Sequence, residues 1–349
     1  MKNKTQEKLN TLVEQLKADK HQYVPKLQEQ IDWTNYDQAQ VNEINDMLLL
    51  IRDIVDKAKR NLGLDEAPDN VGPGRPKNSA SDEAKVILMQ QYFCVSNRVA
   101  AGYALLFKEK LHLDKVFSYK TIERAYQDLQ VTQILQQIFT LTQEPVCERE
   151  HAFGPDGTGL STSMKQNYET DRQSGKVHKG YEKMIVMVGC KYKLLSAFQF
   201  AQSPTDNESP YFEPLLAQTA EVYRQIDFVP ADSAYMSRRN CNLVAGVGAL
   251  PRFYPRKGVT LCQKGSVSWR KMLMDLLCDP QKWLEEYHVR SNAETAFSTL
   301  KRDCPVPLRK KIPLRKKQEA FTRACNYNLK RLCYLHYLEG IDTTEAWAD

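Results

Sequence analysis

Apolar and polar residues follow a helical spacing along the first part of the chain. In residues 9–16, and again in Met47–Ile54, apolar side chains recur every three or four positions. Pro25 interrupts the first pattern, so we expect two or three helices within residues 1–64. The region holds ten basic and ten acidic side chains, and this balance favours helical packing or self-association over a main surface for a charged partner.

Residues 65–80 are predicted to be a linker, because two prolines and two glycines within Gly72–Pro76 prevent regular structure. The segment contains Gly-Arg-Pro-Lys, which is similar to the core of an AT-hook, an extended element that lies in the minor groove of A·T-rich DNA. Arg75 and Lys77 are therefore candidate DNA contacts. A plain linker is the alternative.

Residues 81–145 return to a helical pattern. Ser118 is a suitable N-cap for a segment that could be the recognition helix of a helix-turn-helix. Lys120, Arg124 and Tyr126 would then reach DNA. An ordinary helical bundle explains the same pattern.

From about residue 150 the pattern changes to alternating strands and helices, and a domain is predicted over 150–340. Helices are expected over Tyr211–Arg224, Arg238–Ala245 and 287–301. Strands are expected over Ala152–Thr162, Lys183–Cys190, Lys193–Phe200, Ile226–Ala231 and Gly248–Tyr254. The order βββαβαβα indicates an α/β domain, in which a mixed sheet is flanked by helices and preceded by the α-helical N-terminal region.

The stretch 287–301 combines two stripes if it forms a single helix. At about 100° per residue, Tyr287, Arg290, Glu294 and Lys301 fall within roughly 60° of one another. Apolar side chains form a separate stripe that would face a core. A solvated charged face is the ordinary explanation, but an acid placed among cations also suits contact with a phosphate and a metal.

Two aspartates stand upstream at strand positions. Asp156 lies in Pro-Asp-Gly-Thr-Gly on the first predicted strand, and Asp232 lies in Ala-Asp-Ser-Ala-Tyr at the end of the fourth. Taken alone, each aspartate is explained by the common role of Asp in turns, where its side chain bonds the nearby backbone. Pro155 lacks a backbone donor, so we expect the first strand to bulge there or to begin pairing after it. Asp156, Asp232 and Glu294 together would supply the hard oxygen ligands that Mg²⁺ takes.

These three segments resemble the insertion-sequence transposases that carry a DDE triad and a Y-(2)-R-(3)-E-(6)-K signature. The resemblance covers about 150–335 and implies an RNase H-like catalytic domain. Asp156, Asp232 and Glu294 would be the catalytic residues and would hold two Mg²⁺ ions, for which Mn²⁺ could substitute. Tyr287, Arg290 and Lys301 would position DNA. The implied activity is polynucleotidyl transfer, in which element ends are cleaved and then joined to target DNA.

Basic residues concentrate in segments that can follow a phosphate backbone. Residues 301–331 carry eleven Lys or Arg against two acids, which is a net +9 in a chain of +6. Basic and aromatic residues also alternate in an expected insertion at about 248–283, as in segments that grip unpaired DNA. A solvated loop is the alternative for each. The further candidate DNA contacts are Lys179, Lys183, Arg252, Arg256, Lys257, Trp269, Arg302, Lys310 and Lys311.

Composition narrows the class of protein. The nine cysteines show no CxxC pair, which suits a reducing cytosol and gives little support to a zinc site. The charged N-terminus lacks the apolar core of a signal peptide, and no apolar run approaches the roughly 18 residues of a membrane span. We therefore expect a cytoplasmic protein, and the resemblance to insertion-sequence transposases implies that it is associated with a prokaryotic nucleoid.

The expected partner is double-stranded DNA, both transposon ends and target, bound by a homodimer; no membrane and no small-molecule substrate are expected. Two other functions fit the same residues. One is a catalytically silent, transposase-derived DNA-binding protein. The other is an RNase H-like nuclease that cuts DNA without joining it.

Overall fold

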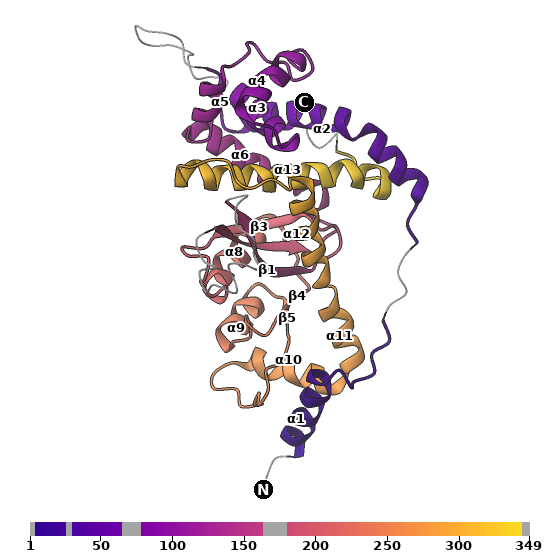
Figure 1. Ribbon diagram of the computed structural model, residues 1–349. Coiled ribbons are helices and arrows are strands. Elements are labelled where there is room, and N and C mark those ends of the chain that lie inside the picture. Colours follow the sequence, from indigo (N-terminus) through magenta and orange to yellow (C-terminus); the bar gives the residue numbers. More distant parts are fainter. Residues whose placement is uncertain (1–3, 26–29, 65–77, 163–179, 344–349) are drawn as a thin grey trace. The chain divides into compact units, whose positions relative to one another are not determined.

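The computed structural model describes residues 4–25, 30–64, 78–162 and 180–343 (Figure 1). Residues 65–77 of the predicted linker, with Arg75 and Lys77, and the candidate contact Lys179 lie outside these residues. No described helix is both long enough and apolar enough to cross a membrane.

The chain divides into two compact units. The first, here the sheet unit, comprises Met1–Gln30, Cys147–Thr158 and Lys183–Phe297. The second, the helical unit, comprises Ile31–Val146, Gly159–Glu182 and Ser298–Asp349. This division differs from the predicted boundaries at 64, 80 and 150. Helix α1 (Lys4–Lys17) packs against α10 (Val267–Cys278) in the sheet unit, whereas the last helix belongs to the helical unit.

The predicted order of strands and helices after residue 150 is confirmed. The strands are β1 (Phe153–Ser161), β2 (Tyr181–Gly189), β3 (Leu195–Phe200), β4 (Phe228–Ala231) and β5 (Leu250–Phe253). The helices among and after them are α8 (Phe212–Val222), α9 (Arg238–Gly246), α10, α11 (Pro280–His288) and α12 (Ser291–Asp303), with a short 3-10 helix, η2 (Ser209–Tyr211), before α8. The protein is thus of mixed α/β class.

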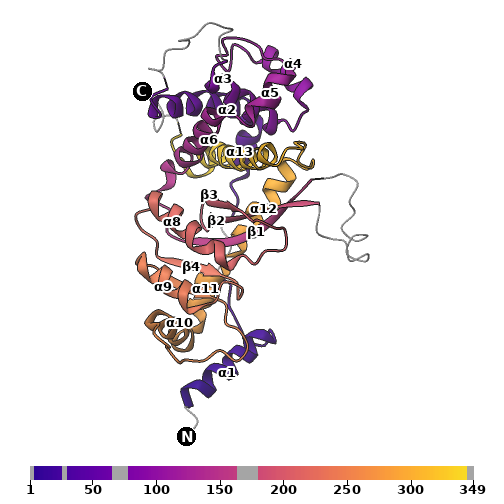
Figure 2. The same cartoon turned by 90° about the vertical axis from the view of Figure 1, so that its left-hand side faces the viewer.

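The strands form two hydrogen-bonded groups. β1, β2 and β3 lie in that order, as Figure 2 shows, and β2 pairs antiparallel with β3, Met184 opposite Phe200. β4 pairs parallel with β5. A parallel bridge between Ala152 and Phe228 makes β1 and β4 neighbours, so the strand order is β3, β2, β1, β4, β5. The most strongly apolar run of the predicted strands, Met184–Val188 of β2, is fully buried and forms part of the core.

Prolines limit the pairing of β1 with β4. Pro155 lies within β1 and Pro230 within β4, and neither has an N–H to donate. The two strands still approach closely, because a Cβ on Gly154 would lie 3.2 Å from the Pro230 carbonyl oxygen. β1 runs through Pro155 from Phe153. Of the two expectations for this proline, pairing that begins only after it is wrong, and the bulge stays a prediction. The missing donors explain why, among the described residues, the two groups are joined by the one bridge between Ala152 and Phe228.

Replacing Gly189 by Ala is expected to destabilise the protein by about 1–3 kcal/mol. An added Cβ would lie 2.6 Å from the Oε2 of Glu150. That carboxylate is buried and accepts the backbone N–H groups of Lys191 and Tyr192, so it cannot move aside. Urea unfolding measures the loss. Gly246→Ala is the matched control, because nothing lies within 4 Å of its added Cβ; an equal loss in both variants would contradict the steric explanation.

The helical unit is built around α13 (Pro313–Glu339), the long yellow helix in Figure 1. It packs against α2 (Trp33–Asn61), α3 (Ala80–Tyr92) and α6 (Leu129–Leu141). Two short helices, α4 (Asn97–Leu106) and α5 (Tyr119–Ala125), pack against α3, and η1 (Glu144–Val146) follows α6. Side-chain caps define several starts, and Gly340, with φ of 61°, ends α13 in the left-handed conformation.

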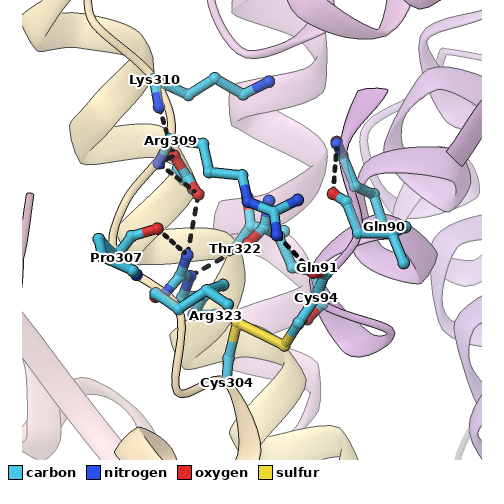
Figure 3. Close-up of polar contacts among 12 residues, drawn as sticks. Gln90, Gln91, Cys94, Cys304, Pro307, Arg309, Lys310, Thr322 and Arg323 are labelled. Atoms are coloured by element: carbon cyan, nitrogen blue, oxygen red, sulfur yellow. Dashed lines mark hydrogen bonds and ion pairs between the residues drawn. A yellow bond between two sulfur atoms is a disulfide. The ribbon is translucent and has the colours of Figure 1, made fainter. Parts of the chain in front are cut away.

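A buried ion pair within α13 holds the segment that precedes this helix, through hydrogen bonds from both of its partners (Figure 3). Glu319 is fully buried and accepts the backbone N–H groups of Arg309 and Lys310 at 2.8 and 2.9 Å. Arg323 donates to Glu319 at 2.9 Å and to the carbonyl oxygen of Val306 at 2.8 Å. Glu319 thus gives this irregular segment the backbone partners that regular structure would otherwise provide.

Cys94 and Cys304 form a disulfide within the helical unit, drawn in yellow in Figure 3. We expected cysteines suited to a reducing environment, and this pair departs from that expectation. The two residues are separated by 210 positions, so no local motif in the sequence indicates that they meet.

Candidate active site

The stretch 287–301 is not a single helix, so that prediction is wrong. Helix α11 ends at His288, and α12 begins at Ser291. Between them the backbone tightens, since the N–H of Asn292 bonds the Val289 carbonyl three residues earlier. The Ser291 hydroxyl donates to the His288 carbonyl at 3.0 Å, a serine contact that bends helices.

The break divides the four polar residues between two helices and the turn that joins them, but Arg290 and Glu294 remain in contact. Tyr287 lies in the last turn of α11, Arg290 in the turn, Glu294 in the first turn of α12 and Lys301 in its last turn. The Asn292 amide donates to the Cys190 carbonyl, which follows β2, at 2.7 Å. This bond fixes the start of α12 beside the sheet.

The two predicted aspartates come from neighbouring strands. Asp156 lies within β1, and Asp232 directly follows β4. The carboxylate of Asp156 accepts the N–H of Gly157 at 2.9 Å. That of Asp232 accepts the N–H of Ala234 at 2.7 Å, so it also shapes the turn after β4. The exposed Arg256 supports the same turn by donating to the Ser233 carbonyl at 2.6 Å.

Arg290 contacts both β1 and Glu294. Its guanidinium donates to the Glu294 carboxylate at 2.7 Å. Its alkyl chain lies over β1, because a Cβ on Gly154 would be 3.8 Å from the Arg290 Cγ. Burial raises the pKa of the adjacent Tyr287 phenol, which is thereby kept protonated as a donor, and the ring stacks on Trp283 at 5.6 Å. Trp283 is buried.

A fourth acid, Glu208, belongs to the site although the sequence does not single it out. It accepts the Tyr235 hydroxyl at 3.0 Å and pairs with Lys183 at 2.9 Å. Its carboxylate lies against Gly157, where an added Cβ would come within van der Waals overlap of it. A side chain directly after Asp156 would therefore displace the Glu208 carboxylate, and Asp-Gly is the single sequence signal that a side chain approaches there.

Burial raises the pKa of Asp156 to about 6. The Gly157 N–H and the positive charge of Arg290 act in the opposite direction, while the negative charges of Glu208 and Glu294 add to the rise. The site therefore has an excess of negative charge that a bound cation would relieve.

Asp156→Asn is expected to raise the melting temperature of the metal-free protein at pH 8. An acid whose folded pKa is raised stabilises the fold only while protonated, and that contribution is lost as pH rises through about 6. The variant's advantage should shrink as pH falls from 8 to 5. Thermal unfolding in EDTA across this range measures it, and an advantage that grows toward low pH would contradict the assignment.

The carboxylates of this site provide the oxygen ligands that a hard divalent cation takes. Among the residues that the structure describes, however, no three His, Cys, Asp or Glu side chains are grouped closely enough to hold a metal ion. The Glu294 carboxylate is paired with Arg290 in this structure.

Three predicted DNA contacts are buried, and their predictions are corrected. Arg252 pairs with Glu286 at 2.5 Å and Asp275 at 3.3 Å inside the sheet unit. The buried Trp269 donates its indole N–H to the Thr260 carbonyl, so it is not placed to stack on a base. The buried Lys310 pairs with Glu123 at 2.7 Å within the helical unit.

Other candidates remain on the surface. Ser118 caps α5 as predicted, and Lys120 and Arg124 on that helix are exposed. Tyr126 is instead buried, where its hydroxyl donates to Gln90, so the prediction that it reaches DNA is wrong. Lys183 is held by Glu208. The remaining exposed candidates are Arg256, Lys257, Lys301, Arg302 and Lys311.

Comparison with known proteins identifies a relative of this chain. No model of a known protein family matches it. Over 233 residues it is 26% identical to a protein of Archaeoglobus fulgidus named "Probable transposase for insertion sequence element ISA1214", covering 66% of this chain and 68% of the relative. The chain is thus similar in sequence to an insertion-sequence transposase.

A solved structure also aligns with the chain. It is a synaptic complex of piggyBac transposase with hairpin DNA, aligned over 87% of this chain and 77% of that one at 11% identity. The TM-score is 0.38, which is too low to support an argument about the fold.

Proposed function

We propose that this chain is a DNA transposase of an insertion sequence, with Asp156, Asp232 and Glu294 as its DDE triad. The observation that carries the proposal is the meeting of three sequence segments at one place. Asp156 and Asp232 come from the neighbouring strands β1 and β4, and the Arg290–Glu294 pair lies against β1 at Gly154. The sequence similarity to a named insertion-sequence transposase supports the same function.

We further propose that the domain around these residues is RNase H-like. The element order βββαβαβα, followed by the helices that carry Glu294, supports this assignment. So does the strand order β3, β2, β1, β4, β5, which places the two aspartates on adjacent strands.

The three carboxylates would hold two Mg²⁺ or Mn²⁺ ions. When bound, such ions activate the attacking oxygen and stabilise the leaving oxygen of a phosphodiester. Arg290 can bind a phosphate through two N–H groups, and Tyr287 can donate to a neighbouring phosphate oxygen. Lys301 adds a positive charge on the last turn of α12. These three residues position DNA and transfer no proton.

The proposed partner is double-stranded DNA, bound both as element ends and as target. The exposed Lys120 and Arg124 on α5, together with Arg256 and Lys257 after β5, supply positive charge for its backbone. A homodimer assembled on DNA would hold two ends at once. The cytoplasm of a prokaryote is the proposed location.

A cleavage and joining assay tests the function. The purified chain is incubated with Mg²⁺ or Mn²⁺, labelled duplexes that carry the inverted repeats flanking its gene, and a plasmid target. Cleavage at the repeat end followed by joining to the plasmid is expected. Binding without cleavage would favour the silent DNA-binding protein, and cleavage without joining would favour the nuclease.

A further inference from the structure

We infer that Arg290 is a positioning residue that holds Glu294 apart from the two aspartates until a DNA phosphate binds its guanidinium. The phosphate would then release Glu294 to complete the metal site. This inference rests on the proposed function, because it takes Glu294 as the third metal ligand. It assigns the Arg290–Glu294 contact a regulatory role in addition to the DNA contact proposed for Arg290.

The two partners of the pair differ in how firmly they are held. The Arg290 side chain is 19% exposed, lies over Gly154 of β1 and is adjacent to Tyr287. The Glu294 side chain is 59% exposed, and no second hydrogen bond holds it among the contacts described for this chain. When the pair opens, the carboxylate is therefore the partner that moves.

Glu294 lies near Asp156, because its partner Arg290 packs over Gly154, two residues before Asp156 on β1. Its negative charge already contributes to the electrostatic environment of Asp156, as does the positive charge of Arg290. Its position in the first turn of α12 is fixed by the Asn292 bond to Cys190. A change of side-chain rotamer is then the smallest motion that redirects the carboxylate, and it leaves the backbone unchanged.

The strengths of the competing contacts favour exchange. An ion pair between residues four apart with an exposed partner shifts an equilibrium only about two- to fivefold. A phosphate bound by both N–H groups of an arginine is a stronger, charge-assisted contact. Lys183 cannot take over the role of Arg290, since it is paired with Glu208 at 2.9 Å and donates to the Asp206 carbonyl at 2.8 Å. By linkage, DNA and a divalent cation would each raise the affinity for the other.

A double-mutant cycle on Mn²⁺ binding tests the inference without requiring activity. Free Mn²⁺ is measured by electron paramagnetic resonance in titrations of the full, DNA-free chain. Arg290→Gln is expected to bind Mn²⁺ about two- to fivefold more tightly than wild type, because Glu294 is released. In the Glu294→Gln background the same substitution should lose most of this gain. An equal gain in both backgrounds would mean that Arg290 acts only as a nearby positive charge and would overturn the inference.

The same cycle separates this inference from the proposed function. If the Arg290→Gln/Glu294→Gln double variant binds Mn²⁺ as tightly as Arg290→Gln does, Glu294 is not a metal ligand, and the triad assignment fails. If it weakens binding there but Arg290→Gln has equal effects in both backgrounds, the triad stands and only the positioning role fails.

A second measurement uses DNA and a charge-conserving variant. Binding of a fluorescein-labelled duplex is followed by anisotropy with Ca²⁺, which is not expected to support cleavage, or with EDTA. Wild type should bind DNA more tightly with Ca²⁺, and Glu294→Gln should show less than half of that gain. Arg290→Lys, whose fold is verified by circular dichroism, should keep part of it. A gain of equal size in wild type and Glu294→Gln would contradict the coupling.

Discussion

Glu294→Gln is expected to lower the rate of DNA-end cleavage by more than about a hundredfold, with DNA binding in the absence of a divalent cation preserved. Changes beside a metal site, outside its direct ligands, cost about 10–100-fold, and loss of a direct ligand should cost more. The substitution keeps the shape of the side chain and removes its charge, so Arg290 becomes available to phosphate. Asp156→Asn and Asp232→Asn should behave alike. Single-turnover cleavage of labelled ends and a parallel anisotropy titration measure both effects.

Asp227→Asn is the matched control for the aspartates. Asp227 is an exposed acid beside the opposite end of β4 from Asp232, so its substitution changes the same charge on the same strand away from the site. It should leave cleavage within about threefold of wild type, as surface substitutions usually have small effects. Cleavage that survives Glu294→Gln, or that falls equally in Asp227→Asn, would remove the basis for the triad.

Glu319→Ala is expected to destabilise the helical unit by about 3–5 kcal/mol, which is the typical cost of breaking a buried ion pair by removing one partner. The guanidinium of Arg323 would remain buried without its carboxylate at 2.9 Å, and the N–H groups of Arg309 and Lys310 would lose their acceptor. Urea unfolding monitored by circular dichroism measures the loss through the midpoint at an unchanged slope.

Asp53→Ala provides the comparison within the same unit. Asp53 pairs with Arg52 at 2.6 Å, but its side chain is 43% exposed, so its loss should cost less than about 1 kcal/mol. Similar losses for the two variants would show that burial does not determine how much the Glu319–Arg323 pair contributes to the free energy of unfolding.

The strands were more readily predicted than helices α11 and α12. The β-branched and apolar run of β2 and the short apolar segments of β4 and β5 specify strands through local composition, and the structure confirms them. The region 287–301 has a helical periodicity of equal quality, yet it contains a break. The contacts that produce the break include Asn292 with Cys190, 102 residues away in sequence, and periodicity carries no information about such partners.

The same limit applies to the side chains of the candidate site. The sequence does not distinguish a basic residue that is exposed from one that pairs with an acid inside the fold. Arg252 was therefore predicted to contact DNA, because its partner Glu286 lies 34 residues away in sequence. Glu208 was missed because it follows an irregular segment and belongs to no motif. Asp156 and Asp232 were predicted from short boxes at strand positions, and their roles in metal binding and catalysis remain predictions.

The prolines in β1 and β4 also influence how the sheet opens. With one bridge between the two groups of strands, separating β4 and β5 from β1 breaks few backbone hydrogen bonds. Amide protons of β4 and β5 should therefore exchange with solvent deuterium through a local opening of lower free energy than that which exposes β2 and β3. Asp232 would then stand on the more readily opening part of the sheet, and Asp156 on the more slowly exchanging one.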